Sequence, residues 1–161
     1  MRHWLMKSEP DVFSIDDFAR VGREPWTGVR NHQARNFMRD DMQIGDPVLF
    51  YHSSCAEPGV VGTARVASAA YPDPSQFERD SEYFDARSTH AQPRWVLVDV
   101  EFEQKFAQPV TLARLRNEPR LAGCALLQRG NRLSILPFTH AQWDIVLGMA
   151  SSRQQQGTRH A

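Results

Sequence analysis

The sequence of 161 residues has few cysteines, almost no lysine, no long apolar run and no excess of either charge. Its two cysteines, Cys55 and Cys124, are too few for a disulfide framework or a four-cysteine zinc site. No apolar run approaches the roughly 20 residues of a membrane-spanning helix. The N-terminal segment lacks the apolar stretch of about 7–15 residues typical of a secretory signal. We therefore expect a soluble, cytoplasmic protein with reduced thiols and no membrane partner.

The charges are balanced, with 19 basic and 19 acidic residues and a formal net charge of zero. This balance excludes a protein that coats nucleic acid by bulk electrostatics, but it allows a local basic patch. Only Lys7 and Lys105 are lysines; the other basic residues are arginines, whose planar guanidinium suits recognition of phosphate and base edges. Genomic codon bias would produce the same composition, so the arginine content alone assigns no ligand.

Several motifs of catalysis and cofactor binding are missing. The phosphate-binding patterns GxxxxGK[ST] and GxGxxG are absent, and no histidine pair or cysteine cluster has metal-ligand spacing. We therefore predict no metal, no cofactor and no catalytic residue. Cys55 with His52 would make a nucleophile and its base, but no third group orients them. Glu9 is the most suggestive single carboxylate, although it can equally satisfy backbone donors in the loop after the first strand.

What is present is an ordinary globular composition, 41% hydrophobic and 24% charged, over a length that fits one domain. No internal repeat or linker interrupts it. The last residues are polar and lack an apolar pattern, so we predict a domain over residues 1–150 and a disordered tail over 151–161. The compact chain suggests a bacterial origin.

The hydrophobic pattern predicts more strands than helices. Strands are expected at 3–7, 48–52, 60–69, 95–106 and 133–136, and residues 71–93 are expected to form an extended loop with a short helix. Capping residues precede four expected helices: Ser14, Asn31, Thr111 and Thr139. Because strands and helices do not alternate regularly, we predict an α/β fold of the α+β kind, with a mostly antiparallel, barrel-like sheet and flanking helices.

The segment from Trp26 to Phe37 is the richest in chemistry. A tryptophan precedes a glycine turn, and the turn opens a helix that carries arginines. A helix N-terminus favours an anion, and Arg30, Arg35 and Arg39 would add charge-assisted bonds to phosphate. Trp26 offers a flat face on which a base can stack. Alternatively, Trp26 belongs to the core and the arginines form a solvated face.

Two other segments carry clustered polar side chains. An apolar strand ends in Tyr51, His52, Ser53 and Ser54, which would suit the rim of a pocket or simply a strand end that meets solvent. The turn over residues 128–132 is basic and either contacts a nucleic-acid backbone or is plain surface.

Several segments resemble the EVE domain family and occur in the same order along the chain as they do in that family. Together they cover about residues 2–149. The matching segments are Trp4–Pro10, Trp26–Asn31, Gln33–Phe37, Phe50–Ser53, Pro58–Gly62, Tyr71–Pro74, Pro93–Trp95 and Leu127–Gly130. The resemblance implies a PUA-like fold. By kinship with YTH domains it also implies a pocket for a modified base, read without catalysis.

The resemblance assigns roles at two matching motifs. Lys7-Ser8 is similar to the Lys-Ser pair that ends the first YTH strand and contacts the base edge through its backbone. Trp26-Thr27 is similar to the YTH tryptophan, one wall of the aromatic cage, and the small hydroxyl residue after it. The second cage aromatic has three candidates: Tyr71, Phe84 and Trp95.

The sequence thus predicts a non-enzymatic, monomeric reader of modified nucleobases, such as a modified cytosine, in DNA or RNA. The predicted pocket residues are Lys7, Ser8, Glu9, Trp26, Thr27, Asn31, Tyr51, His52, Ser53 and Tyr71. The predicted phosphate-binding residues are Arg30, Arg35, Arg39, Arg129 and Arg132. The alternatives are an enzyme that acts on a nucleotide or small metabolite, and a protein-interaction module.

Overall fold

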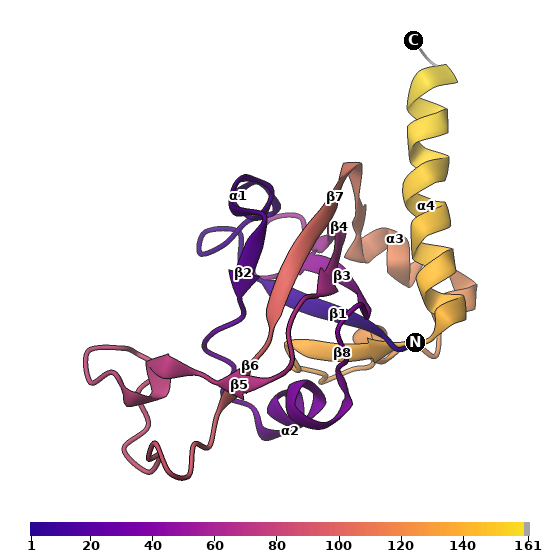
Figure 1. The fold of residues 1–161 in the computed structure, drawn as a ribbon. Coiled ribbons are helices and arrows are strands. Elements are labelled where there is room, and N and C mark those ends of the chain that lie inside the picture. The colour runs from indigo at the N-terminus through magenta and orange to yellow at the C-terminus, as the bar shows by residue number, and fades with distance from the viewer. Residues whose placement is uncertain (160–161) are drawn as a thin grey trace.

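A six-stranded sheet with the strand order β2-β7-β4-β3-β1-β8 forms the centre of the computed structural model (Figure 1). The structure describes residues 1–159, with side chains to residue 151. The strands are β1 His3–Ser8, β2 Arg23–Pro25, β3 Pro47–His52, β4 Gly59–Val66, β7 Asp99–Thr111 and β8 Ile135–Phe138. Only β1 and β3 pair in parallel; the other neighbours in this sheet are antiparallel. The predicted α+β fold with a curled, mostly antiparallel sheet is confirmed.

The central strands β1, β3 and β4 are buried on both faces. Successive side chains of a strand point to opposite faces, so alternate residues join different cores. Trp4 and Phe50 belong to one hydrophobic cluster, whereas Leu5 and Tyr51 belong to the other. These strands are therefore apolar at consecutive positions, and they end in polar residues where the sheet meets solvent.

The helices begin where the capping residues predict. They are α1 Ile15–Val21, α2 His32–Asn36, α3 Leu112–Arg116 and α4 His140–Arg159. Ser14 and Asp17 form a complete capping box, and the Asn31 side chain accepts a hydrogen bond from the Ala34 N–H. A π-helical turn, Phe37–Asp41, follows α2, and short 3-10 turns lie at Pro74–Phe77, Pro119–Leu121 and Ala125–Leu127.

The expected strand over residues 95–106 is divided in the structure. Its first part, β6 (Val96–Leu97), pairs with β5 (Tyr71–Pro72) in a separate two-stranded sheet, and β7 then begins at Asp99. Leu97 and Val98 are both fully buried, so the alternation of inward and outward residues breaks between them. The segment between β5 and β6 projects from the sheet (Figure 1), and its position matters for the site described below.

The predicted disordered tail over 151–161 stays a prediction. The backbone of α4 continues to Arg159, in keeping with the good helix propensity of glutamine and arginine in this segment. Residues 160 and 161 lie outside the described residues. Within the described part, no helix is long and apolar enough to cross a membrane.

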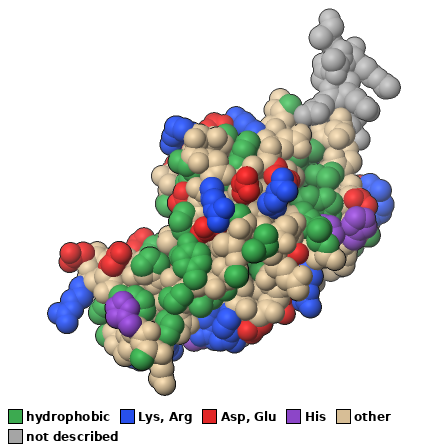
Figure 2. Space-filling view, in the orientation of Figure 1, with side chains coloured by type: hydrophobic (Ala, Val, Ile, Leu, Met, Phe, Trp, Pro, Cys, Tyr) green, Lys and Arg blue, Asp and Glu red, His purple; other side chains and the backbone are tan. Residues whose placement is uncertain are grey.

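Most basic side chains on the surface lie beside acidic ones. Figure 2 shows this pairing on one face, where Lys and Arg side chains alternate with Asp and Glu. Examples are Arg23 with Asp99, at 3.0 Å, and Arg65 with Glu103, at 2.8 Å. Positive and negative charges therefore balance within small regions of the surface as well as over the whole chain.

Candidate functional site

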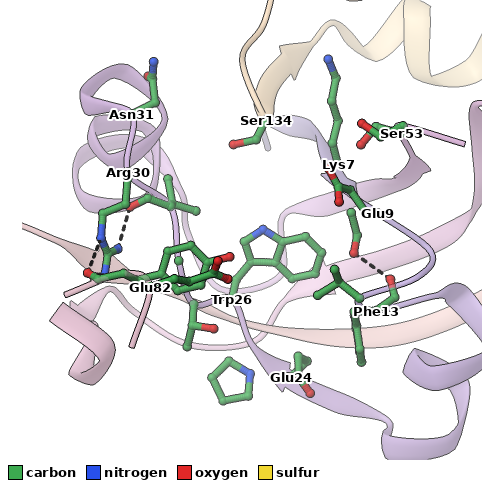
Figure 3. Close-up of a pocket in the computed structure, with 18 of the residues that line it drawn as sticks. Lys7, Glu9, Phe13, Glu24, Trp26, Arg30, Asn31, Ser53, Glu82 and Ser134 are labelled. Carbon is green, nitrogen blue, oxygen red and sulfur yellow. Dashed lines mark hydrogen bonds between the residues drawn. The ribbon is translucent and has the colours of Figure 1, made fainter. Parts of the chain in front are cut away.

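A pocket of about 840 Å³ opens where the ends of β1 and β3 meet the chain that leaves β2 (Figure 3). Its volume lies in the range of about 300–1,000 Å³ that is typical of small-ligand sites. The lining residues come from five segments of the chain. They are Lys7–Glu9 with Val12 and Phe13, Glu24–Asn31, Ser53 and Ser54, Glu82 and Tyr83, and Arg132 with Ser134.

Trp26 lies at the centre of this pocket and also packs in the core. Only 8% of the residue is exposed, and its ring makes edge-to-face contacts with Phe13 and Phe50, with centroids 6.4 Å and 5.8 Å apart. No described residue accepts a hydrogen bond from its indole N–H. In Figure 3 the indole nitrogen faces the side of the pocket that carries Lys7 and Ser134. Trp26 is therefore a core residue with a polar edge that is available to a ligand.

Tyr83 forms part of the wall because the turn after Trp26 contains a glycine. Gly28 has a φ of +84°, and its N–H donates to the Asp73 carboxylate at 2.8 Å. A Cβ at this position would lie 2.6 Å from the Tyr83 ring. The absence of a side chain therefore lets the tyrosine rest directly on the backbone of the turn.

Arg30 ties the Tyr83 segment to this turn. Its Nε and Nη2 donate to the Tyr83 carbonyl at 3.0 Å and 2.8 Å, and Nη2 also donates to Ser75 at 3.0 Å. Its Nη1 donates to the Val29 carbonyl at 2.9 Å and to the Asp73 carboxylate at 3.2 Å. These bonds use all five N–H groups of a guanidinium. The geometry therefore does not favour the predicted phosphate-binding role of Arg30, because its donors are all used within the protein.

Asp73 is the buried acceptor in this network. Its side chain has no exposed surface. Burial alone would raise the pKa of Asp73, but hydrogen bonds from Ser75, the Gly28 N–H and Arg30 outweigh it and hold the pKa below its ordinary value. The carboxylate is therefore charged near neutral pH and fixes three segments together.

Unlike Arg30, Arg35 and Arg39 are not among the residues that line the pocket. Arg35 donates to the Arg94 carbonyl at 2.9 Å and to the Asn36 side chain at 3.0 and 3.1 Å. Arg39 makes a two-pronged ion pair with Asp40, at 2.8 and 3.0 Å. The predicted arginine face is thus bound within the protein. Arg39 pairs with a carboxylate, whereas Arg35 donates to uncharged oxygen acceptors.

Nine of the predicted residues line the pocket together. They are Lys7, Ser8, Glu9, Trp26, Thr27, Arg30, Asn31, Ser53 and Arg132. Arg129 is exposed in the same turn as Arg132 but is not part of the lining.

Three predicted pocket residues lie elsewhere. Tyr51 is 3% exposed in the second hydrophobic cluster. His52 accepts the Ile15 N–H on its Nε2 at 3.0 Å and so caps α1, and burial lowers its pKa. The Tyr71 hydroxyl donates to Asp99 at 2.5 Å; burial and this bond raise its pKa to about 12. The strand end after Phe50 does form a rim, but the rim begins at Ser53 rather than at Tyr51.

The candidates for a second aromatic wall are replaced by Tyr83. Tyr71 is engaged with Asp99, and Phe84 is 39% exposed outside the lining. Trp95 is buried; His32 stacks on its ring with centroids 4.9 Å apart, and its N–H donates to Asp85 at 2.8 Å. No local pattern in the sequence distinguishes Tyr83 from its neighbours, since Gly28 and Arg30 place it from far away in the chain.

The two sides of the pocket differ in charge. Lys7, Ser53 and Ser134 lie on one side of Trp26, and Glu24 lies on the other (Figure 3). Burial lowers the pKa of Lys7, and no described carboxylate pairs with its ammonium group. Burial, followed by the nearby charge of Asp99, raises the pKa of Glu24. The pocket thus offers cationic and hydroxyl donors near Lys7 and a carboxylate acceptor at Glu24, and the carboxylates of Glu9 and Glu82 also line it.

Comparisons with known proteins agree with this description. The family model described as the EVE domain matches residues 2–149. Thymocyte nuclear protein 1 from Homo sapiens is 39% identical over 166 residues, which cover 91% of this chain and 73% of the relative.

Two solved structures illustrate the similarity in three dimensions. A hypothetical protein from Leishmania major has a TM-score of 0.91 and 43% identity, covering 96% of this chain and 97% of its own. The human THYN1 protein, solved in complex with 5-methylcytosine containing DNA, has a TM-score of 0.88 and 38% identity, with 93% and 98% covered.

Proposed function

This chain belongs to the EVE domain family, and we propose that it reads a modified nucleobase in nucleic acid without transforming it. The observation that carries the proposal is the human relative, whose structure contains 5-methylcytosine DNA and superposes over nearly the whole chain. A pocket built around an indole with a free N–H is the site that such a ligand requires here.

The base enters the pocket only after it leaves its stack, at a cost of a few kcal/mol that is smallest in single strands or at mismatches. Its ring packs against Trp26, with Tyr83 as a second aromatic wall. The indole N–H of Trp26 donates to an acceptor on the base edge. The Glu24 carboxylate suits an exocyclic amine, as carboxylates do when they accept from the N4 amine of cytosine.

Binding rather than turnover is the function that the side chains support. The candidate base His52 already accepts a hydrogen bond from Ile15 on its Nε2. The candidate nucleophile Cys55 is not among the residues that line the pocket. We propose DNA as the first polymer to test because of the human relative, and a single copy of the chain as the binding unit.

The test compares the affinity of the protein for oligonucleotides that carry 5-methylcytosine or cytosine at one position, as single-stranded DNA, duplex DNA and single-stranded RNA. A methyl group that fills an apolar corner contributes about 0.8 kcal/mol, or roughly a fourfold preference. Equal affinity for all modified and plain strands would contradict the proposal.

Trp26→Phe is the informative variant, since it keeps an aromatic ring in the core and removes only the indole N–H and some ring area. We expect the preference for the modified strand to disappear while the protein still melts cooperatively. Tyr71→Phe is the matched control, because Tyr71 lies outside the pocket, and it should keep the wild-type preference. A Trp26→Phe protein with unchanged preference would place the base elsewhere.

A further inference from the structure

Most described arginine and lysine side chains are already bound within the protein, as are Arg30, Arg35 and Arg39. Among the side chains that the structure describes, a few cations make no hydrogen bond or ion pair. They are Lys7, Arg79, Arg116, Arg129 and Arg132. Unpaired cations retain their full capacity to bind an external anion, so their distribution indicates where an anionic partner binds.

Two of these cations lie in the pocket itself. Lys7 and Arg132 both line it, and the Lys7 N–H donates to the Ser134 carbonyl at 2.8 Å, which joins β1 to the segment that follows Arg132. Lys7 is half-buried, and Arg132 is exposed. The edge of the pocket between these segments therefore has two positive charges and no carboxylate partner for either.

Two more unpaired cations extend this edge. Arg129 is exposed in the same turn, which reverses at Gly130 with a φ of +81°. Arg116 ends α3, which begins where the Leu112 N–H donates to the Pro58 carbonyl at 2.8 Å, beside the paired residues His52 and Gly59. His52 directly precedes the pocket rim at Ser53. The charge of Arg116 also opposes the rise in the pKa of Tyr51 that burial causes. The Lys7 ammonium lies 5.8 Å from the centre of the same ring. Lys7, Arg116, Arg129 and Arg132 are called the cationic edge below.

Hydroxyl groups accompany the cationic edge. The carboxylates of the pocket lining are Glu9, Glu24 and Glu82, and none of them forms an ion pair with Lys7 or Arg132. Ser53 and Ser134 line the pocket on the side of Lys7, whereas Glu24 lies on the far side of Trp26 (Figure 3). Phosphate is typically bound by arginine, lysine and serine side chains together, in contacts that position a strand without reading its sequence. Arg79, by contrast, follows Glu78 and precedes Asp80 on the projecting segment.

We propose that the sugar–phosphate backbone of the bound strand runs along the cationic edge. Lys7 and Arg132 bind the phosphates on either side of the captured base, and Arg116 and Arg129 bind phosphates farther along the strand. This inference deepens the proposed function and rests on it for the position of the base. It assigns the phosphate contacts to cations other than Arg30, Arg35 and Arg39.

The first test measures the salt dependence of binding to a single-stranded oligonucleotide. The variants are K7Q/R132Q and R116Q/R129Q, and the matched control is R39Q/R79Q, which removes the same charge elsewhere. Each phosphate contact contributes about 0.7 to the slope of log K against log salt for single strands. We expect each edge variant to lower the slope by about 1.4 and to weaken binding equally for modified and plain strands.

The control should keep the wild-type slope. If R39Q/R79Q lowers the slope as much as the edge variants, binding is unspecific attraction to positive charge, and the proposal is overturned. Unchanged slopes in both edge variants would overturn it equally.

A second test removes the charge from the ligand instead of the protein. Methylphosphonate linkages replace the two phosphates that flank the modified base. The wild-type protein should lose about as much affinity as K7Q/R132Q loses with the natural strand, and K7Q/R132Q should lose little more. Fully additive losses would mean that Lys7 and Arg132 do not contact these phosphates.

The two proposals fail in different ways. If the wild type shows no preference for a modified base but the edge variants lower the salt slope, the reader function is wrong and the cationic edge remains. If the preference is intact and the slopes do not change, the base site remains and the cationic edge is wrong.

Discussion

Arg30 and Arg132 are both arginines that line one pocket, yet their surroundings differ completely. Arg30 spends its N–H groups on Tyr83, Val29, Ser75 and the buried Asp73, whereas Arg132 is exposed and makes no hydrogen bond or ion pair among the described residues. Arg30 holds the pocket wall at Tyr83 in place, and Arg132 is available to bind a ligand. The availability of a cation thus depends on its partners in the fold.

The largest expected effect comes from exchanging each of these arginines for lysine. Arg30→Lys replaces five N–H donors by one ammonium, which cannot bond Asp73, Ser75, Val29 and Tyr83 together. Breaking a buried pair costs about 3–5 kcal/mol when a partner is lost. We expect a loss of about 2–3 kcal/mol in the free energy of unfolding by urea. Arg132→Lys, the matched control, should stay within about 0.5 kcal/mol of wild type. Similar losses of unfolding free energy in Arg30→Lys and Arg132→Lys would contradict the proposed difference between the two arginines.

Two glycines allow the same comparison at the level of the backbone. Gly28 and Gly130 have nearly equal φ values of +84° and +81°, but a Cβ meets the Tyr83 ring at 2.6 Å only at Gly28. Gly130→Ala should cost about 1 kcal/mol from backbone strain alone. Gly28→Ala should cost about 1–3 kcal/mol more and weaken binding of the modified strand, because Tyr83 must move.

The outcome to watch is the difference between these two alanine variants in chemical unfolding and in binding. Equal destabilisation, with wild-type affinity in both, would mean that the contact between Gly28 and Tyr83 does not shape the pocket.

Sequence reasoning succeeded where the partners are close together in the chain. Ser14 with Asp17 and Asn31 with Ala34 are separated by three residues, and a local rule predicts each pair. Most strand positions also follow from short apolar segments, although β2 was not predicted and the strand expected over 95–106 is divided. These features required no knowledge of the tertiary fold.

The rest of the site depends on contacts that no short-range rule encodes. Gly28 and Asp73 are 45 residues apart, and Arg30 reaches Tyr83 across 53 residues. The pattern from Trp26 to Phe37 predicted a pocket, and Trp26, Thr27 and Asn31 line one. The same pattern gave no indication that Arg30 binds within the protein. The wall residue Tyr83 was missed for the same reason.

A smaller effect should appear in acid. The pKa of Asp73 is below its ordinary value in the folded protein, so the carboxylate stabilises the fold above about pH 4. This contribution is lost as the pH falls through the folded pKa. The free energy of unfolding of the wild type, measured with urea at pH 5.5, 4.5 and 3.5, should therefore decline as the pH falls. In Asp73→Asn the decline should be smaller by about 1 kcal/mol. Arg132→Gln should decline as steeply as wild type, because no carboxylate pairs with Arg132.

The smallest expected effect is also the sharpest check on which cations face the ligand. Arg35 follows Arg30 on the segment that the sequence favoured for phosphate binding, but its donors contact the Arg94 carbonyl and Asn36. Burial, together with the charges of Arg39 and Arg94, lowers its pKa. Arg35→Gln should therefore change the slope of log K against log salt by no more than about 0.2. The same variant should lower the free energy of unfolding by about 1 kcal/mol. Arg132→Gln should lower the slope by about 0.7 at unchanged stability. Titration of both variants with one fluorescent oligonucleotide between 50 and about 200 mM salt separates the two arginines, and a reversed order would return the phosphate contacts to α2.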